Sequence, residues 1–195
     1  MVKNVIFDIG NVILKFNRDY LLSHFYQGDE YEFLKEKVFY NWEELDEDLI
    51  SLEDYNKRVL NSLPPHLHAP AMAVLNNWEY YMSHVDGIVD LIRELKLKGY
   101  NLYVLSNMTR HFIPNEYRFP IFKEFDGIVY SAPIGIIKPN PKIFEYIINK
   151  FNLNPEETVF IDDIKENLAA AARFKIKTFH FNNNTNSLRE FILSL

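Results

Sequence analysis

The sequence predicts an α/β fold in which a doubly wound parallel sheet of about five strands carries a helical insert after its first strand. Two observations support this prediction. From Asp86 onward, short apolar runs alternate with segments of helical spacing, as in strands joined by crossover helices. Residues 17–84 break that alternation with helical spacing and no convincing strand. We therefore expect residues 1–16 and 85–195 to form the sheet domain and residues 17–84 to form the insert.

The first predicted strand is the run Val5-Ile6-Phe7, which is too short for a helix and ends at Asp8. Helices are then expected at 87–98, 141–151, 165–174 and 187–193, and strands at 101–106, 128–131, 158–162 and 177–181. Asn140-Pro141 and Asn154-Pro155 each place a capping side chain before a proline at the first helical position, and Glu157 completes a capping box on the second. Gly99 is placed to stop the helix before it.

The insert contains an acidic tract, Trp-Glu-Glu-Leu-Asp-Glu-Asp, at residues 42–48. We expect this tract to form a solvated helix face, because its charge would repel a phosphate. The many aromatic side chains of the insert are expected mostly in a hydrophobic core, where one or two could stack on a sugar ring.

Composition limits the class of protein. The chain has 195 residues, 48% of them hydrophobic, enough for one sizeable core, and it has no cysteine for disulfides or thiolate metal sites. Its net charge is −6 and no block of Lys and Arg could follow a nucleic acid backbone. Met1 leads directly into the first strand, without a targeting leader or a long apolar span. We expect a soluble cytoplasmic protein with no nucleic acid or membrane partner.

Three carboxylates follow predicted strands: Asp8 after the first, and Asp162 with Asp163 at the end of strand 158–162. Open α/β sheets bind ligands at this edge. Adjacent carboxylates repel each other, a divalent cation relieves that repulsion, and oxygen ligands suit Mg²⁺. Gly10 would let the backbone turn sharply under Asp8. The residues alone leave plainer roles open, namely an Asx turn at Asp8 and a capping box of Asp163 with Glu166.

A hydroxyl, an amide and a cation fall at the same predicted edge. Ser106 and Asn107 end strand 101–106, and Lys138 lies in a loop that follows a later strand. Taken singly, the first two are typical of a helix cap and the third of a solvent lysine. Together with the acids they predict a site for phosphoryl chemistry.

These motifs resemble those of the haloacid dehalogenase superfamily. They occur in the family order as Asp8-Ile9-Gly10-Asn11-Val12, Leu105-Ser106-Asn107, Lys138-Pro139 and Ile161-Asp162-Asp163. The resemblance implies a Rossmann-like core of strand order 5-4-1-2-3, with the insert as a cap domain that covers the catalytic face and selects substrates. The wording of the first motif and the stretch at 105–110 most resemble sugar-phosphate phosphatases that act on α-glucose 1-phosphate.

The resemblance also implies roles for single residues. Asp8 would be both the nucleophile and a Mg²⁺ ligand, and the Gly10 carbonyl would be a second ligand. In the last motif, Asp163 is the preferred candidate for a further Mg²⁺ ligand and Asp162 is the next. In the same family pattern Ser106 and Asn107 would hold the oxygens of the transferring phosphoryl group. Lys138 would neutralise Asp8 and the phosphate.

One position departs from the family pattern. Phosphatases of the family carry an aspartate two residues after the nucleophile as general acid and base, and here that position is Gly10. Such help is worth about 10²- to 10⁴-fold. The leading hypothesis is a magnesium-dependent phosphomonoesterase that hydrolyses a small phosphorylated metabolite, a sugar phosphate, through a phosphoaspartate at Asp8. The alternative is an impaired member that binds phosphorylated ligands or a protein partner without turnover.

Two further interpretations are weaker. A phosphorylatable receiver domain uses similar groups, but in it the acid pair follows the first strand and the phosphoacceptor a later one. Dehalogenases of the family lack the second aspartate too, yet they need no metal, whereas Asp162 and Asp163 argue for one.

Overall fold

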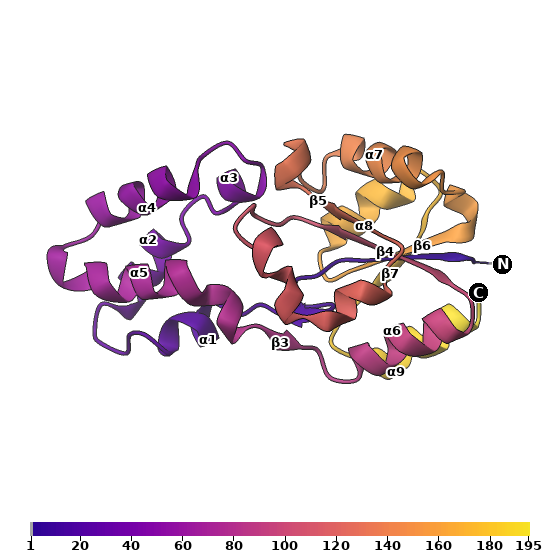
Figure 1. The fold of residues 1–195 in the computed structure, drawn as a ribbon, viewed down its shortest axis with the longest axis horizontal. Helices are drawn as coiled ribbons and strands as arrows, with labels where there is room; N and C mark the ends of the chain where they lie inside the picture. The colour runs from indigo at the N-terminus through magenta and orange to yellow at the C-terminus, as the bar shows by residue number, and fades with distance from the viewer. Residues whose placement is uncertain (1) are drawn as a thin grey trace.

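The computed structural model describes residues 2–195 as a parallel sheet between two helical layers, with a helical lobe at one end (Figure 1). The sheet strands are β1 (Asn4–Phe7), β4 (Asn101–Ser106), β5 (Gly127–Tyr130), β6 (Thr158–Asp162) and β7 (Lys177–His180). Their order is β5-β4-β1-β6-β7, and each neighbouring pair is parallel. The strands β2 and β3 lie outside this sheet. When the five sheet strands are numbered along the chain and read from the β7 edge, their order is 5-4-1-2-3, as the resemblance implied.

Helices cover both faces of the sheet (Figure 1). They are α6 (Ile88–Leu97) and α9 (Thr185–Leu193) on one face, and α7 (Pro141–Phe151) and α8 (Lys165–Ala172) on the other. Along β1 the buried side chains alternate between these layers, because successive residues of a strand point to opposite faces. Val5 and Phe7 belong to the core with α6 and α9, and Ile6 to the core with α7 and α8. The predicted α/β class is confirmed.

The residues predicted to begin and end helices do so at three positions and not at a fourth. Asn140 and Asn154 do cap the turns that follow them, accepting hydrogen bonds from the backbone N–H of Lys142 and Glu156 at 3.1 Å. Gly99 follows α6 with φ of +86°, a conformation that glycine adopts without strain. The predicted capping box after Asn154 is wrong. The segment is a short 3₁₀ turn, and the Glu157 carboxylate lies 2.9 Å from the ammonium of Lys3 instead.

The lobe contains the helices α1 (Arg18–Ser23), α2 (Tyr31–Val38), α3 (Glu43–Asp46), α4 (Leu52–Asn61) and α5 (His68–Asn77). The chain enters and leaves it through a two-stranded antiparallel ribbon of β2 (Leu14–Lys15) and β3 (Ser83–His84). The expectation of no strand within residues 17–84 is therefore wrong at β3. Strands of two residues are too short to show the alternation that identifies a strand in sequence.

The lobe packs on the sheet domain through aromatic side chains. The rings of Trp42 and Trp78 lie 5.7 Å apart, edge to face, and Trp78 stacks on Phe112 at 6.1 Å. All three are buried in the core that also contains one face of the sheet. Short 3₁₀ turns connect the elements at Pro65–Leu67, Trp78–Tyr81, Ile113–Arg118, Pro120–Glu124, Ala132–Ile134 and Pro155–Glu157. Among residues 2–195, none of the helices has the length and apolar character needed to cross a membrane.

Candidate active site

The pairing of β1 with β6 brings the predicted acids together. Phe7 lies opposite Ile161 in the parallel register, so the residues that follow them, Asp8 and Asp162, emerge side by side at the carboxyl edge of the sheet. Carboxylate oxygens of Asp8, Asp162 and Asp163 lie within 4.8 Å of one another. Three negative charges at this spacing require compensation by a cation.

Lys138 supplies part of that compensation. Its Nζ atom lies 2.8 Å from Oδ1 of Asp8 and 2.7 Å from Oδ2 of Asp162. The side chain is buried, so the predicted solvent-lysine alternative is wrong. Burial opposes the charged form, but the two carboxylates outweigh it and raise the pKa of Lys138. Burial raises the pKa of Asp8 to about 6, against the opposing effect of Lys138.

Asp162 is fully committed to contacts within the protein. Besides Lys138, its carboxylate accepts hydrogen bonds from the backbone N–H of Ile164 at 2.8 Å and from the Asn167 amide at 3.1 Å. The capping box of Asp163 with Glu166 is therefore not formed, and no side chain caps α8. Asp162 holds the start of that helix, and the side chain of Asp163 stays partly exposed at the site.

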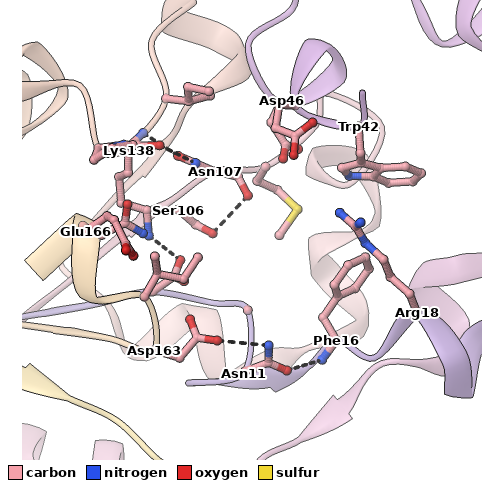
Figure 2. A pocket seen from close by; sticks show the side chains of 18 of the residues that line it. Asn11, Phe16, Arg18, Trp42, Asp46, Ser106, Asn107, Lys138, Asp163 and Glu166 are labelled. Carbon is pink, nitrogen blue, oxygen red and sulfur yellow. Dashed lines mark hydrogen bonds and ion pairs between the residues drawn. The ribbon is translucent and has the colours of Figure 1, made fainter. Parts of the chain in front are cut away.

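The turn after Asp8 is built differently from the prediction. The left-handed residue is Asn11, at φ of +54°, and Gly10 is not in that region. Asparagine tolerates this conformation. The Asn11 side chain donates to Oδ2 of Asp163 at 3.1 Å and accepts from the backbone N–H of Phe16 at 3.0 Å (Figure 2). The loop thereby fixes Asp163 against the first motif, a contact with no signal in the sequence.

Ser106 and Asn107 lie at the same edge. Ser106 is buried at the end of β4. The Asn107 amide accepts a hydrogen bond from the backbone N–H of Lys138 at 2.7 Å and donates to the Lys138 carbonyl at 2.9 Å. This side chain is engaged by the neighbouring loop, and Asn107 also lines the cavity, so its contact with a phosphoryl group stays a prediction.

Six of the seven predicted site residues line one cavity of about 500 Å³ between the sheet edge and the lobe. The exception is Asp162, which is buried behind it. Figure 2 shows Ser106, Lys138 and Glu166 on one side and residues of the lobe on the other. The lobe and the segment before it also contribute side chains that were not predicted from the sequence to belong to the site. They are Phe16, Arg18, Trp42, Glu43, Asp46, Trp78 and Met82.

Asp46 is the most notable of these additions. The prediction of a solvated acidic tract is wrong for this residue, because it lines the cavity while Asp48 and Glu44 pair with arginines outside it. Burial and the neighbouring Glu43 and Asp8 raise the pKa of Asp46 to about 8. A helix of four residues gives no periodicity from which its inward face could be predicted.

The residues present fit a magnesium ion. Hard divalent cations prefer carboxylate and carbonyl oxygens, and Asp8 and Asp163 offer carboxylates within the acidic cluster. The Gly10 carbonyl accepts no hydrogen bond from the described part of the chain, residues 2–195. Asp162 is the poorest candidate of the four predicted ligands, because Lys138, Ile164 and Asn167 already occupy its oxygens.

A parallel sheet of this order, with clustered carboxylates and a buried lysine at its carboxyl edge, defines a Rossmann-like α/β protein of the kind that handles anionic ligands. The family is shown directly by comparison. The chain belongs to the haloacid dehalogenase-like hydrolases, whose family model matches residues 2–175.

Two relatives and one solved structure illustrate the similarity. The chain is 27% identical over 213 residues to a D-ribitol-5-phosphate phosphatase of Bacteroides thetaiotaomicron, covering 100% of this chain and 99% of that protein. It is 35% identical over 81 residues to a phosphoglycolate phosphatase of Pasteurella multocida, covering 41% of this chain and 36% of that one. A family enzyme from Bacteroides thetaiotaomicron, crystallised with magnesium and inorganic phosphate, has the same fold, with a TM-score of 0.74 at 21% identity over 94% of this chain and 96% of the other.

Proposed function

We propose that this protein is a magnesium-dependent phosphomonoesterase that hydrolyses a small phosphorylated metabolite, a sugar or polyol phosphate, through a phosphoaspartate at Asp8. The observation that carries the proposal is the buried contact of Asp8 with Lys138 in the wall of the cavity between the sheet edge and the lobe. Membership of the hydrolase family and the similarity to a polyol-phosphate phosphatase along the whole chain support it.

Attack of one anion on another needs positive charge at the site. The ammonium of Lys138 lies close enough to offset the Asp8 carboxylate and an incoming phosphoryl group together. Asp8, Asp163 and the Gly10 carbonyl would hold Mg²⁺, which when bound supplies charge compensation for the phosphoryl oxygens. The net charge of −6 makes this local positive potential necessary for an anionic ligand.

In the first step, an Asp8 carboxylate oxygen attacks phosphorus and the ester bond to the leaving oxygen breaks. In the second step, water attacks the phosphoaspartate and frees phosphate and the carboxylate. Asp162 acts as a positioning residue for Lys138, since it holds the ammonium at 2.7 Å on the side away from the cavity. Asn107 positions the same lysine through its backbone, and Ser106 lies where it can donate to a phosphoryl oxygen.

The leaving group would occupy the part of the cavity next to the lobe. Trp42, Trp78 and Phe16 offer apolar ring surface there, and Arg18 and Asp46 offer polar groups. Figure 2 shows Phe16, Arg18, Trp42 and Asp46 in this part of the cavity. Aromatic rings with a few charged side chains suit a hydroxylated carbon chain or ring, because CH faces pack on the rings while hydroxyls take the hydrogen bonds. This is our basis for a sugar or polyol phosphate rather than an aromatic or nucleic acid substrate.

The second candidate function is phosphorylated-ligand or partner binding without turnover. Gly10 favours it, because the position that carries the acid and base in family phosphatases has no side chain. The two candidates differ in one measurement, namely the release of phosphate.

The experiment is phosphate release from a panel of sugar and polyol phosphates and from 4-nitrophenyl phosphate, with and without Mg²⁺. We expect turnover that disappears in chelator and returns with Mg²⁺, and a fall of at least about 10³-fold in Asp8→Asn. Asp19→Asn, on the lobe surface, is the matched control and should behave as wild type. Equal turnover by Asp8→Asn would contradict the proposal. Magnesium and phosphate binding with no release from any ester would favour the second candidate.

A further inference from the structure

The site lacks a proton donor where a phosphatase of this family would carry one. A Cβ atom placed on Gly10 would lie 4.0 Å from Oδ2 of Asp8 and would meet no other atom within that distance outside its chain neighbours. The space is therefore open and is not filled by another polar side chain of the core. An alkyl ester still needs a proton at its leaving oxygen, since an alkoxide is a poor leaving group.

We propose that Asp46, at the end of α3 in the lobe, is the general acid and base that serves the leaving group. The inference rests on the function proposed above and adds a catalytic residue to it. The nucleophile Asp8 would then lie at the edge of the sheet, and the proton donor Asp46 would lie on the lobe.

The position of Asp46 supports this role. Its side chain lines the same cavity as Asp8, Ser106 and Lys138, and Figure 2 shows it entering from the lobe, between Asn107 and Trp42. An ester held with its phosphoryl group at Asp8 extends its leaving group toward the lobe. The leaving oxygen would then lie between the nucleophile and Asp46, the side from which in-line displacement requires protonation.

The end of α3 is also fixed to the sheet domain. The Ser131 hydroxyl donates to the Asp46 carbonyl at 2.5 Å and accepts from the backbone N–H of Met108 at 2.9 Å. Two residues further on, the Asp48 carboxylate lies 2.7 Å from the Arg110 guanidinium. These contacts join the lobe to the segment that follows Ser106. They hold the Asp46 backbone in a constant position relative to the reacting groups, as general acid catalysis requires.

The surroundings keep a proton on this side chain at neutral pH. Burial and the negative charges of Glu43 and Asp8 raise the pKa of Asp46 to about 8, and the cations of Arg18 and Lys138 only partly oppose them. A group with a pKa near the working pH can both give and take a proton.

The other acids of the cavity suit the role less well. Asp163 is held by Asn11 and belongs to the proposed metal set. Glu43 and Glu166 are exposed to solvent. Among the acids that line the cavity outside the metal set, Asp46 is the least exposed to solvent.

The proton balance is closed over the two steps. As the phosphorus–oxygen ester bond breaks, its electron pair goes to the leaving oxygen, which takes the proton from the Asp46 carboxyl and departs as an alcohol. The resulting Asp46 carboxylate takes a proton from the attacking water. The phosphorus–oxygen bond to Asp8 then breaks, and phosphate leaves with the remaining hydroxyl. Both side chains return to their starting states.

The test compares two leaving groups with Mg²⁺ present. D-ribitol 5-phosphate and glycerol 2-phosphate need protonation of an alkoxide, whereas 4-nitrophenyl phosphate releases a stable phenolate. We expect Asp46→Asn to lower kcat/KM by about 10²-fold or more for the alkyl esters and by less than about threefold for the nitrophenyl ester. The nitrophenyl rate also reports that the variant is folded. Glu47→Gln, the adjacent acid outside the cavity, should leave both rates unchanged, and Asp46→Glu should keep most of the alkyl-ester rate.

A second readout is the pH profile. For alkyl esters the wild-type rate should fall as pH rises through about 8, where Asp46 loses its proton, and this limb should be absent for the nitrophenyl ester. Equal losses on both esters in Asp46→Asn, no loss on either, or a wild type that hydrolyses only the nitrophenyl ester would each overturn the inference. In all three cases a strong loss in Asp8→Asn would still support the proposed function, so the two failures are distinguishable.

Discussion

The Asn107 side chain forms two hydrogen bonds with the backbone of Lys138, one from the Lys138 N–H at 2.7 Å and one to its carbonyl at 2.9 Å. Asn107 follows β4 and Lys138 lies 31 residues later. The pair therefore joins two loops at the carboxyl edge of the sheet. Through it the lysine backbone is held while its ammonium reaches Asp8.

We predict that Asn107→Ala lowers the free energy of unfolding by about 1 to 3 kcal/mol, because it leaves buried backbone groups of Lys138 without partners. The kcat/KM should fall by about tenfold or more as the ammonium loses its fixed position. Asn107→Asp is the matched variant, since it keeps the acceptor for the Lys138 N–H but places a carboxylate oxygen against the Lys138 carbonyl and adds a charge beside three acids. Its losses should therefore be at least as large as those of Asn107→Ala in urea unfolding. A fully stable and active Asn107→Ala protein would contradict this role.

The adjacent acids Asp162 and Asp163 should respond oppositely to the same change. Asp162→Asn removes a fully buried partner of Lys138, so we expect a loss of stability of about 3 kcal/mol, visible as a lower midpoint of urea unfolding. Asp163→Asn leaves stability within about 1 kcal/mol. It should instead raise the Mg²⁺ concentration for half-maximal activity at least about tenfold. If Asp162→Asn changed the magnesium requirement and Asp163→Asn did not, the assignment of ligands would be reversed.

Gly10→Asp should lower turnover although the backbone accepts the change. The position has no left-handed φ and its nearest non-neighbouring atom is the Asp8 Oδ2, 4.0 Å from the new Cβ. A further carboxylate at that range adds a repulsion of about 1 to 4 kcal/mol to a site that already holds three acids. We expect kcat/KM to fall at least about fivefold on both ester types, and Gly10→Asn to lose less. A gain confined to alkyl esters would show that this prediction is wrong.

Asp46 should make stability depend on pH. Its ordinary pKa is 3.8 and its folded pKa is about 8, so the folded protein keeps a proton that the unfolded chain releases. Its contribution is greatest below about pH 4 and is lost as pH rises toward about 8. Asp46→Asn removes that loss. Its unfolding free energy should exceed that of the wild type by at least about 1 kcal/mol at pH 7 and match it at pH 4, in guanidinium titrations. A constant difference across this range would contradict the raised pKa.

The central strands β1, β4 and β6 could be predicted from sequence because they are almost completely buried and appear as short apolar runs. Residues 101–106 and 158–162 are strands with the predicted bounds, and the strand before Asp8 ends at Phe7. The ribbon of β2 and β3 could not be predicted, because two residues are below the length at which a period of two is detectable. The 3₁₀ turns from Ile113 to Glu124 could not be predicted either, because they follow neither the period of a strand nor that of an α-helix.

The predicted residues of the candidate site do come together, because the carboxyl ends of parallel strands share one edge. What failed was the assignment of contacts at close range. Asp162 and Asp163 are adjacent in sequence, yet the first takes the backbone N–H at the start of α8 and the second turns to Asn11. Asp46 was placed in solvent because its direction depends on how the lobe packs, a tertiary property that a charged tract of seven residues does not encode.

Trp42 and Trp78 are the two tryptophans of the chain, and both line the cavity. Trp42 lies on the lobe, and Trp78 stacks on Phe112 of the sheet domain. The protein therefore carries its own optical reporter, with no chromophore of that kind elsewhere to add background. Ligand entry, displacement of water from the cavity and any shift of the lobe would alter the same ultraviolet emission. Occupancy can thus be followed in real time on unlabelled protein, before any product forms.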